Sequence, residues 1–532
     1  MGYGLLAALY LLSFQYHPGL RSPNELCRLW QSRAIVDHGT LVLNQTMREL
    51  GPVGDLSVRE GLYYPSKAPM LSFLGVPVYA ALKAMGPVSE VGQVFWSRLF
   101  ITVLPSLFLL WLLRRFLLTY VSTVFADACL LTYGLGTIAF SYSTQFLSHQ
   151  LTAVLTFAAF YACWRVERGE WPLKGYAVAG ALTGAAVMTE YTGALTVLCL
   201  SVYVVVARAR AQGAKPLAVK IKSLLAPTGW VLLGGAPFLA GLMAYHQACF
   251  GHPLASGYKF LADTAYQGWH VGGFLGIKLP KPEAFLHSYF SPLRGLLAVS
   301  PALTVAFWGF KPLKAERAMF WFVLVLLAAN TYFTSSFDHT SWGWTTGPRH
   351  LTPLLPFLLL PMALGFKRLV EGPNAESRFG YGAAAGLCVT TVVVGGTAAL
   401  INYVPDSVST TLFGLAVPLF EEGFWPISLL SFFGLTNPAG GMMLVGLLLT
   451  SALWVASLLL VQAPENGRAT VRIGLVLAAL LHLGILGSVS KAAATVAAAD
   501  PQKQFDFGAR SHLKSVWLVR PGEAVPADVH LR

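Results

Sequence analysis

Residues 21–70, RSPNELCRLWQSRAIVDHGTLVLNQTMRELGPVGDLSVREGLYYPSKAPM, form the first long polar segment of the chain and follow its first hydrophobic run. They carry eleven charged side chains, whereas most of the sequence after them is apolar with short polar connections. We interpret this segment as a loop on the outer face of a membrane, where it forms one wall of a functional site. The apolar segments then serve to hold the loop in place.

The composition supports a membrane protein. The chain has 532 residues, of which 55% are hydrophobic and 11% charged, and its mean hydropathy is +0.59. Soluble domains have about 25% charged residues. The net charge of +13 does not indicate nucleic-acid binding, because the basic residues lie in short loops between apolar runs, as membrane orientation requires. We therefore expect membrane lipids as partners and no nucleic acid.

The apolar runs predict an all-α polytopic membrane protein with about thirteen transmembrane helices, since a helix needs about 20 residues to cross the hydrocarbon. The first outer loop, 17–92, is long and carries interfacial helices at 23–37 and 69–85, and the second of these is interfacial or re-entrant. Residues 1–489 form one transmembrane domain, and 490–532 form a short polar tail. The predicted crossings are residues 2–15, 93–113, 121–142, 150–166, 176–208 as a hairpin of two helices, 224–248, 295–310, 319–333, 351–366, 381–403, 441–461 and 473–489.

The basic residues also predict the orientation. If the crossings alternate, six basic segments fall on one face, which the positive-inside rule assigns to the cytoplasm. These segments are residues 114–115, 165–174, 208–222, 311–317, 367–378 and 468–472. The amino terminus is then cytoplasmic and the tail periplasmic. Because the six cysteines form no disulfide pattern and the outer loops are compact, we expect a bacterial inner membrane.

The start of the first loop contains a candidate catalytic acid. Ser22, Pro23 and Glu25 have the form of a capping box, with Ser22 as the N-cap and Glu25 at the third helical position. Gly39 suits the end of that helix. Glu25 either caps the helix only or also acts as a general base just above the bilayer, and the two roles are compatible.

Two basic residues of the outer loops are candidates for binding a phosphate. Lys67 follows Tyr64 and precedes an apolar helix, so it either snorkels to lipid headgroups or binds a lipid-linked phosphate. Arg349 either contacts headgroups or acts as a bidentate anion binder. Trp342 and Trp344, just before it, either stack on a sugar or mark the membrane interface.

Glu190 is predicted to lie at the tip of the helical hairpin. The 15 residues from 176 to 190 span about 22 Å as a helix, which is less than about 30 Å of hydrocarbon. Glu190 should therefore lie below the outer surface and face a cavity, where it is a functional candidate or a member of an ion pair. His149, just before the predicted crossing at 150–166, either has its hydrogen bonds satisfied within the protein or contacts a substrate.

No metal site is predicted. Asp338, His339 and His350 are near one another in sequence, but their spacing matches no recognised metal pattern. We therefore expect no tightly bound cofactor and disfavour a divalent metal.

Several of these segments, in their order and outer placement, resemble the GT-C superfamily of membrane glycosyltransferases, which use polyprenyl-phosphate-linked sugars. Within it the chain is most similar to bacterial members near glycosyltransferase family 39, the group of protein O-mannosyltransferases and lipid A aminoarabinose transferases. The resemblance covers roughly residues 1–440. It rests on NELCRLWQSRAIVDHGTLVL, YYPSKAPMLSFLGVPVY, YSTQFLSHQL, SPLRGLLAVSPAL and WGWTTGPRHLTPLLPFL.

The resemblance implies roles for individual residues. It assigns the catalytic carboxylate to Glu25 and the lipid-phosphate contacts to Lys67 and to Arg349 of the Gly-Pro-Arg segment. The family often has an Asp-Glu pair where this chain has Asn24-Glu25, so a metal bridging two acids is not expected. Relatives often have a basic residue where this chain has Glu190, which leaves the role of Glu190 open.

The expected function is transfer of a sugar from a polyprenyl-phosphate carrier to a glycan, lipid or protein acceptor on the outer face, with inversion. Further substrate-binding candidates are Arg28, Tyr64, His149, Glu190, Trp342, Trp344 and His350. The alternative is a polytopic transporter or lipid-linked-sugar flippase. It requires charged residues along a path at mid-membrane, for which Asp127 and Glu190 are the main acids inside apolar runs.

Overall fold

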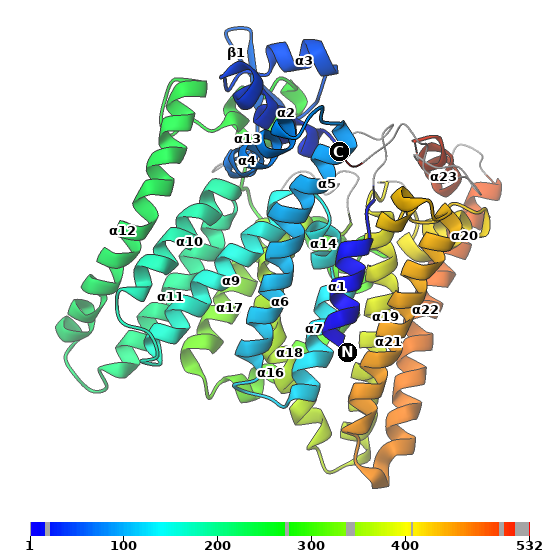
Figure 1. Cartoon of the computed structure of the whole chain (residues 1–532). Helices are drawn as coiled ribbons and strands as arrows, with labels where there is room; N and C mark the ends of the chain where they lie inside the picture. Colours follow the sequence, from blue (N-terminus) through cyan, green and yellow to red (C-terminus); the bar gives the residue numbers. More distant parts are fainter. Residues whose placement is uncertain are drawn as a thin grey trace.

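The computed structural model describes residues 2–15, 22–271, 276–336, 346–405, 408–499, 505–516 and 531. Its long helices run side by side, and short helices and a β-hairpin gather at one end of them (Figure 1). We call this end, which carries α2, β1 and α4, the loop end. The described part is helical except for one two-stranded sheet, which confirms the prediction of an all-α polytopic fold.

Eight helical segments in the described residues are long and apolar enough to cross a membrane. The first combines α5 (Glu90–Arg98), the π-helix η1 (Leu99–Val103) and α6 (Leu104–Leu117). The others are α11 (Gly193–Ala211), α12 (Leu217–Phe250), α17 (Arg317–Ser335), η4 with α18 (Arg349–Leu354, Leu355–Val370), α19 (Ala375–Ile401), α21 (Asn437–Val461) and η7 with α22 (Glu465–Gly467, Arg468–Ala499).

The remaining predicted crossings coincide with helices that are shorter, interrupted or, in α9, less apolar. These are α1 (Gly2–Leu12), α7 with α8 (Thr123–Gly136, Ile138–Ser143), α9 (Ser148–Glu167), α10 (Gly175–Thr189) and α15, η3 and α16 (Leu296–Val299, Pro301–Val305, Ala306–Leu313). The hairpin predicted between 176 and 208 is present as α10 and α11, with Glu190 in extended conformation at its tip. The outer connections contain η2 (Gly257–Phe260), α13 (Thr264–Val271), α14 (Pro282–Phe290), η5 (Thr411–Ala416), α20 (Val417–Glu421) and η6 (Leu429–Phe433).

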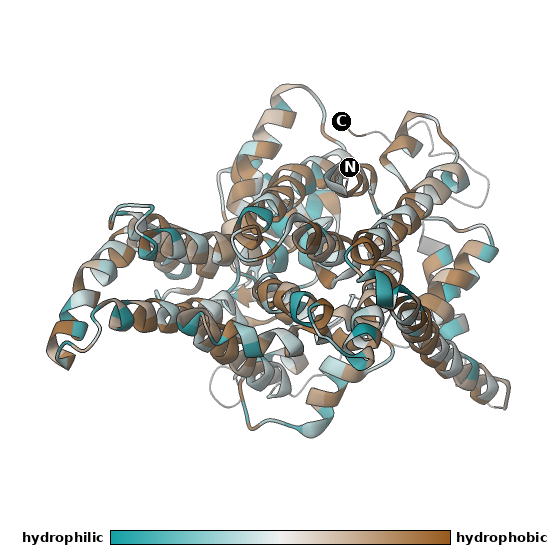
Figure 2. Cartoon of the chain, turned by 90° about the horizontal axis from the view of Figure 1, so that it is seen from below, coloured by the Kyte–Doolittle hydropathy of each residue, from teal (hydrophilic) through white to brown (hydrophobic). Residues whose placement is uncertain are grey.

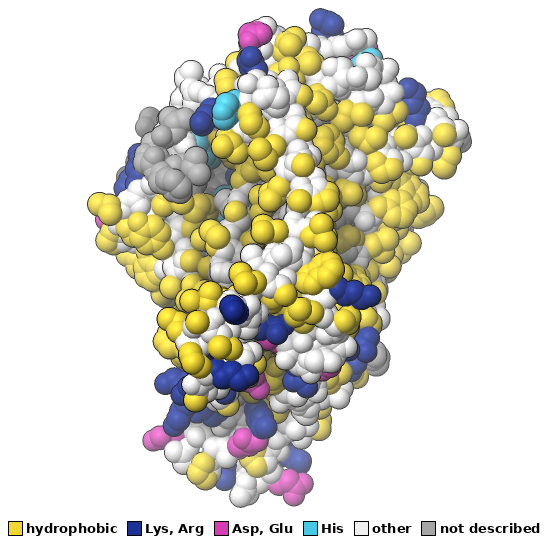
Figure 3. All heavy atoms as spheres, turned by 90° about the vertical axis from the view of Figure 1, so that its left-hand side faces the viewer, with side chains coloured by type: hydrophobic (Ala, Val, Ile, Leu, Met, Phe, Trp, Pro, Cys, Tyr) yellow, Lys and Arg dark blue, Asp and Glu magenta, His cyan; other side chains and the backbone are white. Residues whose placement is uncertain are grey.

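The helices sort into a buried centre and an exposed periphery. In their most apolar windows, 83% of α19 residues are buried, against 11% in α12 and α22. The outward surfaces of α12 and α22 expose leucine, isoleucine and valine, and Figure 2 shows hydrophobic residues along the helices with hydrophilic residues near their ends. Figure 3 shows a hydrophobic belt, with Lys and Arg side chains gathered below it. This distribution is that of a multi-pass membrane protein.

Small residues bring the helices close together. A Cβ added at Gly234 of α12 would lie 1.9 Å from the carbonyl oxygen of Ala177 in α10, and one at Gly309 of α16 would lie 1.7 Å from that of Pro361 in α18. Both distances are far below van der Waals contact. Glycine is therefore required at these two crossings, as is common where membrane helices pack closely.

The first helix of the loop end is α2 (Pro23–His38), and α4 (Met70–Ala84) packs against it. Gly39 ends α2 in the left-handed conformation, with φ 63°, as predicted. The predicted capping box is wrong, because the Ser22 side chain makes no cap hydrogen bond and the Glu25 carboxylate binds elsewhere. The reason is a tertiary contact, because buried Arg98 binds the Glu25 carboxylate in place of the helix N-terminus.

A β-hairpin, which the helical prediction did not contain, follows α3 (Asn44–Leu50). Strand β1 (Leu56–Arg59) pairs antiparallel with β2 (Leu62–Pro65). Glu60 and Gly61 form the two-residue turn with φ of 54° and 77°, as hairpin turns of this length require. On its other side, β1 receives the loop after α12, because the backbone N–H of Ala262 donates to the Leu56 carbonyl.

Helices occupy part of the predicted polar tail, residues 490–532. Helix α22 continues to Ala499, beyond the predicted end at residue 489. Helix α23 (Phe505–Val516) packs on η5, with Leu513 fully buried, and Trp96 Nε1 of α5 donates to the Leu531 carbonyl. The chain therefore ends at the loop end (Figure 1). That this end faces the periplasm, with a cytoplasmic amino terminus, stays a prediction.

Candidate functional site

The β-hairpin brings a lysine and an aspartate together at the loop end. The backbone N–H of Ser66 donates to the Asp55 carbonyl at 2.9 Å, one step beyond the last strand pair. The next residue, Lys67, places its Nζ 3.2 Å from Asp55 Oδ1. Asp55 has φ 57°, a left-handed conformation that Asp and Asn adopt more readily than most residues. The ion pair is thus fixed by the backbone on both sides.

Two arginines complete a group that we call the cation cluster, defined as Lys67, Arg349 and Arg28 around Asp55. Burial alone would raise the pKa of Asp55, but the charges of these three cations together lower it below its ordinary value. Burial lowers the pKa of Lys67, but the charge of Asp55, together with the ionisable hydroxyl of Tyr258, more than offsets this effect, and the net shift is upward. Both groups are therefore charged at neutral pH.

The two arginines whose charges act on Asp55 belong to different elements. Arg349 begins η4, shortly after Gly347, whose φ is 65°. Its Nε is buried and has no hydrogen-bond partner among the described residues. Arg28 lies on α2, where its Nη1 donates to the Asn24 carbonyl at 2.7 Å and its Nη2 to Ser148 Oγ at 3.4 Å. Three segments that are far apart in sequence thus meet here.

The hairpin tip and the start of α9 adjoin the cluster. Ser148 Oγ donates to the Glu190 carboxylate, and His149 Nδ1 lies 3.9 Å from Glu190 Oε2. The His149 ring packs edge to face on His350, with centroids 5.2 Å apart. The Glu190 side chain is 8% exposed, and its depth below the outer membrane surface stays a prediction. Six candidates from the sequence therefore meet in one region, namely Arg28, Lys67, His149, Glu190, Arg349 and His350.

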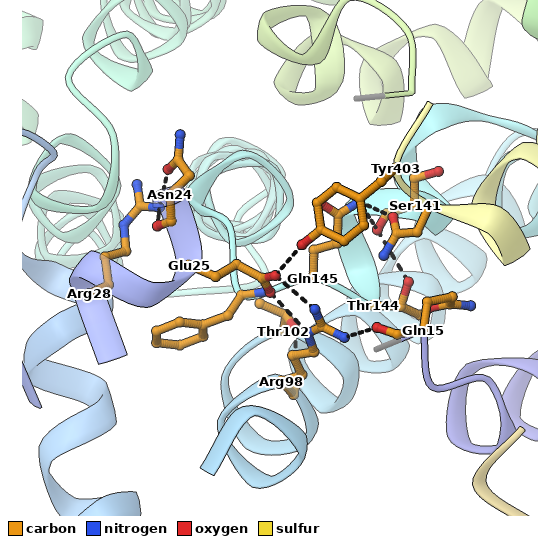
Figure 4. A network of polar contacts seen from close by, with 12 residues as sticks. Gln15, Asn24, Glu25, Arg28, Arg98, Thr102, Ser141, Thr144, Gln145 and Tyr403 are labelled. Carbon is orange, nitrogen blue, oxygen red and sulfur yellow. Dashed lines mark hydrogen bonds and ion pairs between the residues drawn. The ribbon is translucent and has the colours of Figure 1, made fainter. Parts of the chain in front are cut away.

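Glu25 lies beside this region but binds a different cation. Arg98 of α5 donates to both carboxylate oxygens, from Nε to Oε1 at 2.9 Å and from Nη2 to Oε2 at 2.7 Å. The Tyr403 hydroxyl and the Phe146 backbone N–H also donate to this carboxylate. Figure 4 shows Glu25 pointing toward Arg98 and Tyr403, with Gln15 accepting from Arg98. We call the ion pair of Glu25 and Arg98 the buried clamp.

The buried clamp holds the Glu25 carboxylate in its charged form. Burial raises the pKa of Glu25, but the charge and hydrogen bonds of Arg98, with those of Tyr403 and Phe146, lower it overall. The Glu25 and Arg98 side chains are 4% and 5% exposed. A carboxylate that accepts these four hydrogen bonds is a weak proton acceptor. The general-base role of Glu25 stays a prediction, and its contacts are those of a structural ion pair.

An aromatic wall borders Lys67. The Lys67 ammonium lies 5.3 Å from the ring centroid of Tyr258, which stacks on His270 at 4.3 Å and meets Tyr191 edge to face at 5.8 Å. Burial and the charge of Lys67 lower the pKa of His270 to about 4, so this ring is neutral at pH 7. The sequence reasoning did not single out Tyr258 or His270. Aromatic faces beside a cation are suited to sugar rings.

Two other predicted contacts have different positions. Tyr64 packs edge to face on Phe250, with centroids 5.8 Å apart, in a hydrophobic cluster with Tyr245. Its predicted role in substrate binding is not supported by these contacts, because alternate residues of a strand face opposite sides and Tyr64 faces α12. Trp342 and Trp344 lie outside the described residues, as do Asp338 and His339.

Within the described residues, no group of three or more His, Cys, Asp or Glu could hold a metal ion. All six cysteines are buried and free.

No protein-family model matches the chain, and no curated protein matches it. Among solved structures it is similar to apo ArnT from Cupriavidus metallidurans, with a TM-score of 0.48, 13% identity, and coverage of 92% of this chain and 75% of that one. For ArnT bound to undecaprenyl phosphate, the TM-score is 0.42 with 14% identity, covering 89% and 77%. For arabinosyltransferase EmbB from Mycobacterium smegmatis, it is 0.47 with 13% identity, covering 92% and 40%. At these values the likenesses carry no argument about the site.

Proposed function

We propose that the protein is a membrane glycosyltransferase that moves a sugar from a polyprenyl-phosphate carrier to an acceptor at the loop end. The observation that carries this proposal is the cation cluster. Lys67 pairs with Asp55 at 3.2 Å, and the charges of Arg349 and Arg28 act on the same carboxylate, at the end of a bundle of apolar helices. Glu190 adjoins the cluster through Ser148 and is a second acid beside the three cations. The remaining positive charge favours a further anion, and the position at the loop end suits the headgroup of a lipid.

The cluster has the donor groups that a phosphate requires. Lysine supplies a point charge and arginine a planar fork of N–H donors, and both bind phosphate. Arg349 Nε is buried with no hydrogen-bond partner among the described residues, so it is available to a phosphate oxygen. Buried donors are costly unless they are paired, which supports a charged ligand here.

The proposed reaction is a single displacement. An acceptor hydroxyl loses its proton to a carboxylate while its oxygen attacks the anomeric carbon, and polyprenyl phosphate leaves with the electron pair of the broken bond. Lys67 and Arg349 stabilise the charge that develops on the leaving phosphate, an electrostatic effect of the kind that usually dominates catalysis. One displacement inverts the anomeric centre. The aromatic wall at Tyr258 supports a sugar beside the phosphate.

We further propose that the loop end faces the periplasm of a bacterial inner membrane, with the amino terminus in the cytoplasm. The basic loops at the opposite ends of the helices support this orientation. The acceptor is a glycan, lipid or protein. No step in this scheme requires a metal.

The test uses purified full-length protein with a radiolabelled polyprenyl-phosphate sugar. A glycosyltransferase releases free polyprenyl phosphate, whereas a transporter or flippase moves the donor unchanged. Lys67→Met should slow release by about tenfold to a hundredfold at limiting donor, as loss of a charged hydrogen bond does. Lys83→Met is the matched control, because Lys83 is 51% exposed on α4 and pairs with Asp37 away from the cluster. Absence of release from wild-type protein with a range of sugar donors would reject the proposal.

A further inference from the structure

Asp55 occupies the centre of the proposed phosphate site. Its Oδ1 contacts Lys67, and the charges of Arg349 and Arg28 also act on it. We propose that Asp55 is the general base of the transfer, and that the donor phosphate replaces it at Lys67 and so frees it to accept the acceptor proton. This inference rests on the proposed function and assigns a residue to its central step.

The three carboxylates of the region differ in accessibility. Glu25 is 4% exposed and accepts four hydrogen bonds, and Glu190 is 8% exposed and accepts from Ser148. Asp55 is 28% exposed. Among the described residues, Asp55 has one close ionic contact, from Lys67 to Oδ1. Its other carboxylate oxygen, Oδ2, accepts no hydrogen bond from these residues. An acceptor hydroxyl can therefore reach Asp55 more readily than either glutamate.

The exchange of partners changes the basicity of Asp55 in the required direction. While Lys67 faces it, Asp55 has a lowered pKa. A phosphate on Lys67 and Arg349 neutralises these cations and brings a negative charge close to the carboxylate. Both effects raise the pKa of a neighbouring acid. Donor binding thus converts Asp55 from a paired carboxylate into a stronger base at the moment when the sugar is in place.

The atoms of the step balance. The acceptor O–H bond breaks, and its proton goes to a carboxylate oxygen of Asp55. The acceptor oxygen forms the new bond to the anomeric carbon, and the bond from that carbon to the phosphate oxygen breaks. The electron pair of this bond stays on polyprenyl phosphate, next to Lys67. When the phosphate leaves, Lys67 again faces Asp55, which lowers its pKa and releases the proton to water.

Asp55→Asn provides a conservative test. Asparagine has the same shape and tolerates the left-handed backbone at this position, where φ is 57°. We expect kcat to fall by at least about a hundredfold, the usual minimum for loss of a general base. We expect the affinity for unlabelled polyprenyl phosphate in nanodiscs to stay equal or to increase, because a competing carboxylate is removed. Glu60→Gln, at the exposed turn of the same hairpin, is the matched control and should change neither value.

Three outcomes overturn the inference. A kcat within about tenfold of wild type excludes Asp55 as the base. A loss of polyprenyl phosphate affinity of more than about tenfold, or 1.4 kcal/mol, shows instead that Asp55 positions Lys67. If wild-type protein neither binds polyprenyl phosphate nor releases it from a donor, the proposed function fails together with this inference. Wild-type binding and turnover with a fully active Asp55→Asn variant refutes the inference alone.

Discussion

Variants of the buried clamp can distinguish a structural role of Glu25 from a catalytic one. Glu25→Gln removes the negative charge that accepts two hydrogen bonds from Arg98, at 2.9 Å and 2.7 Å. Both side chains are at most 5% exposed. Almost no water can solvate the arginine in the variant. Breaking a buried pair by removing one partner costs about 3–5 kcal/mol. The single variant should therefore lose both stability and activity, whichever role Glu25 has.

The double variant Glu25→Gln with Arg98→Met separates the two roles. It removes both charges, and the amide oxygen at position 25 can accept from the Phe146 N–H while the amide NH2 faces the Tyr403 hydroxyl, whose oxygen can accept from it. Replacing a buried ion pair by neutral groups is often neutral for stability. If Glu25 only holds the fold, the double variant should recover about 3–5 kcal/mol relative to the single variant, and its turnover should return to within about tenfold of wild type.

The assay measures two quantities on the same preparations. Unfolding in mixed detergent and SDS micelles gives the free energy of unfolding, and release of polyprenyl phosphate gives turnover. A double variant that is as stable as wild type but about a hundredfold slower would refute our interpretation. Glu25 would then be the general base that the sequence resemblance implies, and the clamp would serve only to orient it.

The remaining predictions concern charge, pH and orientation. Lys67→Met and Arg349→Met should each weaken polyprenyl phosphate binding by about tenfold to a hundredfold, as loss of a charged hydrogen bond does. Additive losses of binding free energy in the double variant would place the two residues at separate sites. The clamp carboxylate has a lowered pKa, so its contribution to stability is present above the ordinary Glu pKa of about 4.3 and is lost as pH falls through the lowered value. Stability measured from about pH 6 downward should thus fall less steeply in the charge-free double variant, and an equal slope would contradict this. An impermeant thiol reagent on intact cells should label Glu60→Cys but not Ala214→Cys, and the reverse pattern would invert the orientation.

The helices were predictable because hydrophobic length is a local property of the sequence. Each predicted crossing coincides with one or more helices, and Glu190 lies at the predicted tip between α10 and α11. The β-hairpin was missed because its two strands have four residues each. Its turn, Glu60-Gly61, gave only a weak signal, because glycine suits a positive φ but the pairs that favour such a hairpin turn are Asn-Gly and Asp-Gly.

The pairing of charges was not predictable in the same way. Arg98 is 73 positions from Glu25 and lies at the start of a membrane segment, where a basic residue has a ready explanation as an interfacial anchor. Asp55 lies between Gly54 and strand β1, which was not predicted. No periodic pattern therefore indicated which side its carboxylate faces. The cations were easier to identify, because Lys67 and Arg349 each stand close to a proline at the start of an apolar segment.

The buried clamp and the cation cluster are joined by one short segment, which makes them interdependent. The Phe146 N–H donates to Glu25, and two residues later Ser148 Oγ lies within hydrogen-bond distance of both Arg28 and Glu190. A shift of this segment therefore moves Ser148, a partner of Arg28 in the cation cluster, along with the clamp. Residues that act through one network are not additive. A loss of donor affinity on breaking the clamp is thus expected even though Glu25 does not touch the phosphate, and its reversal in the charge-free double variant would identify the 146–148 segment as the connection.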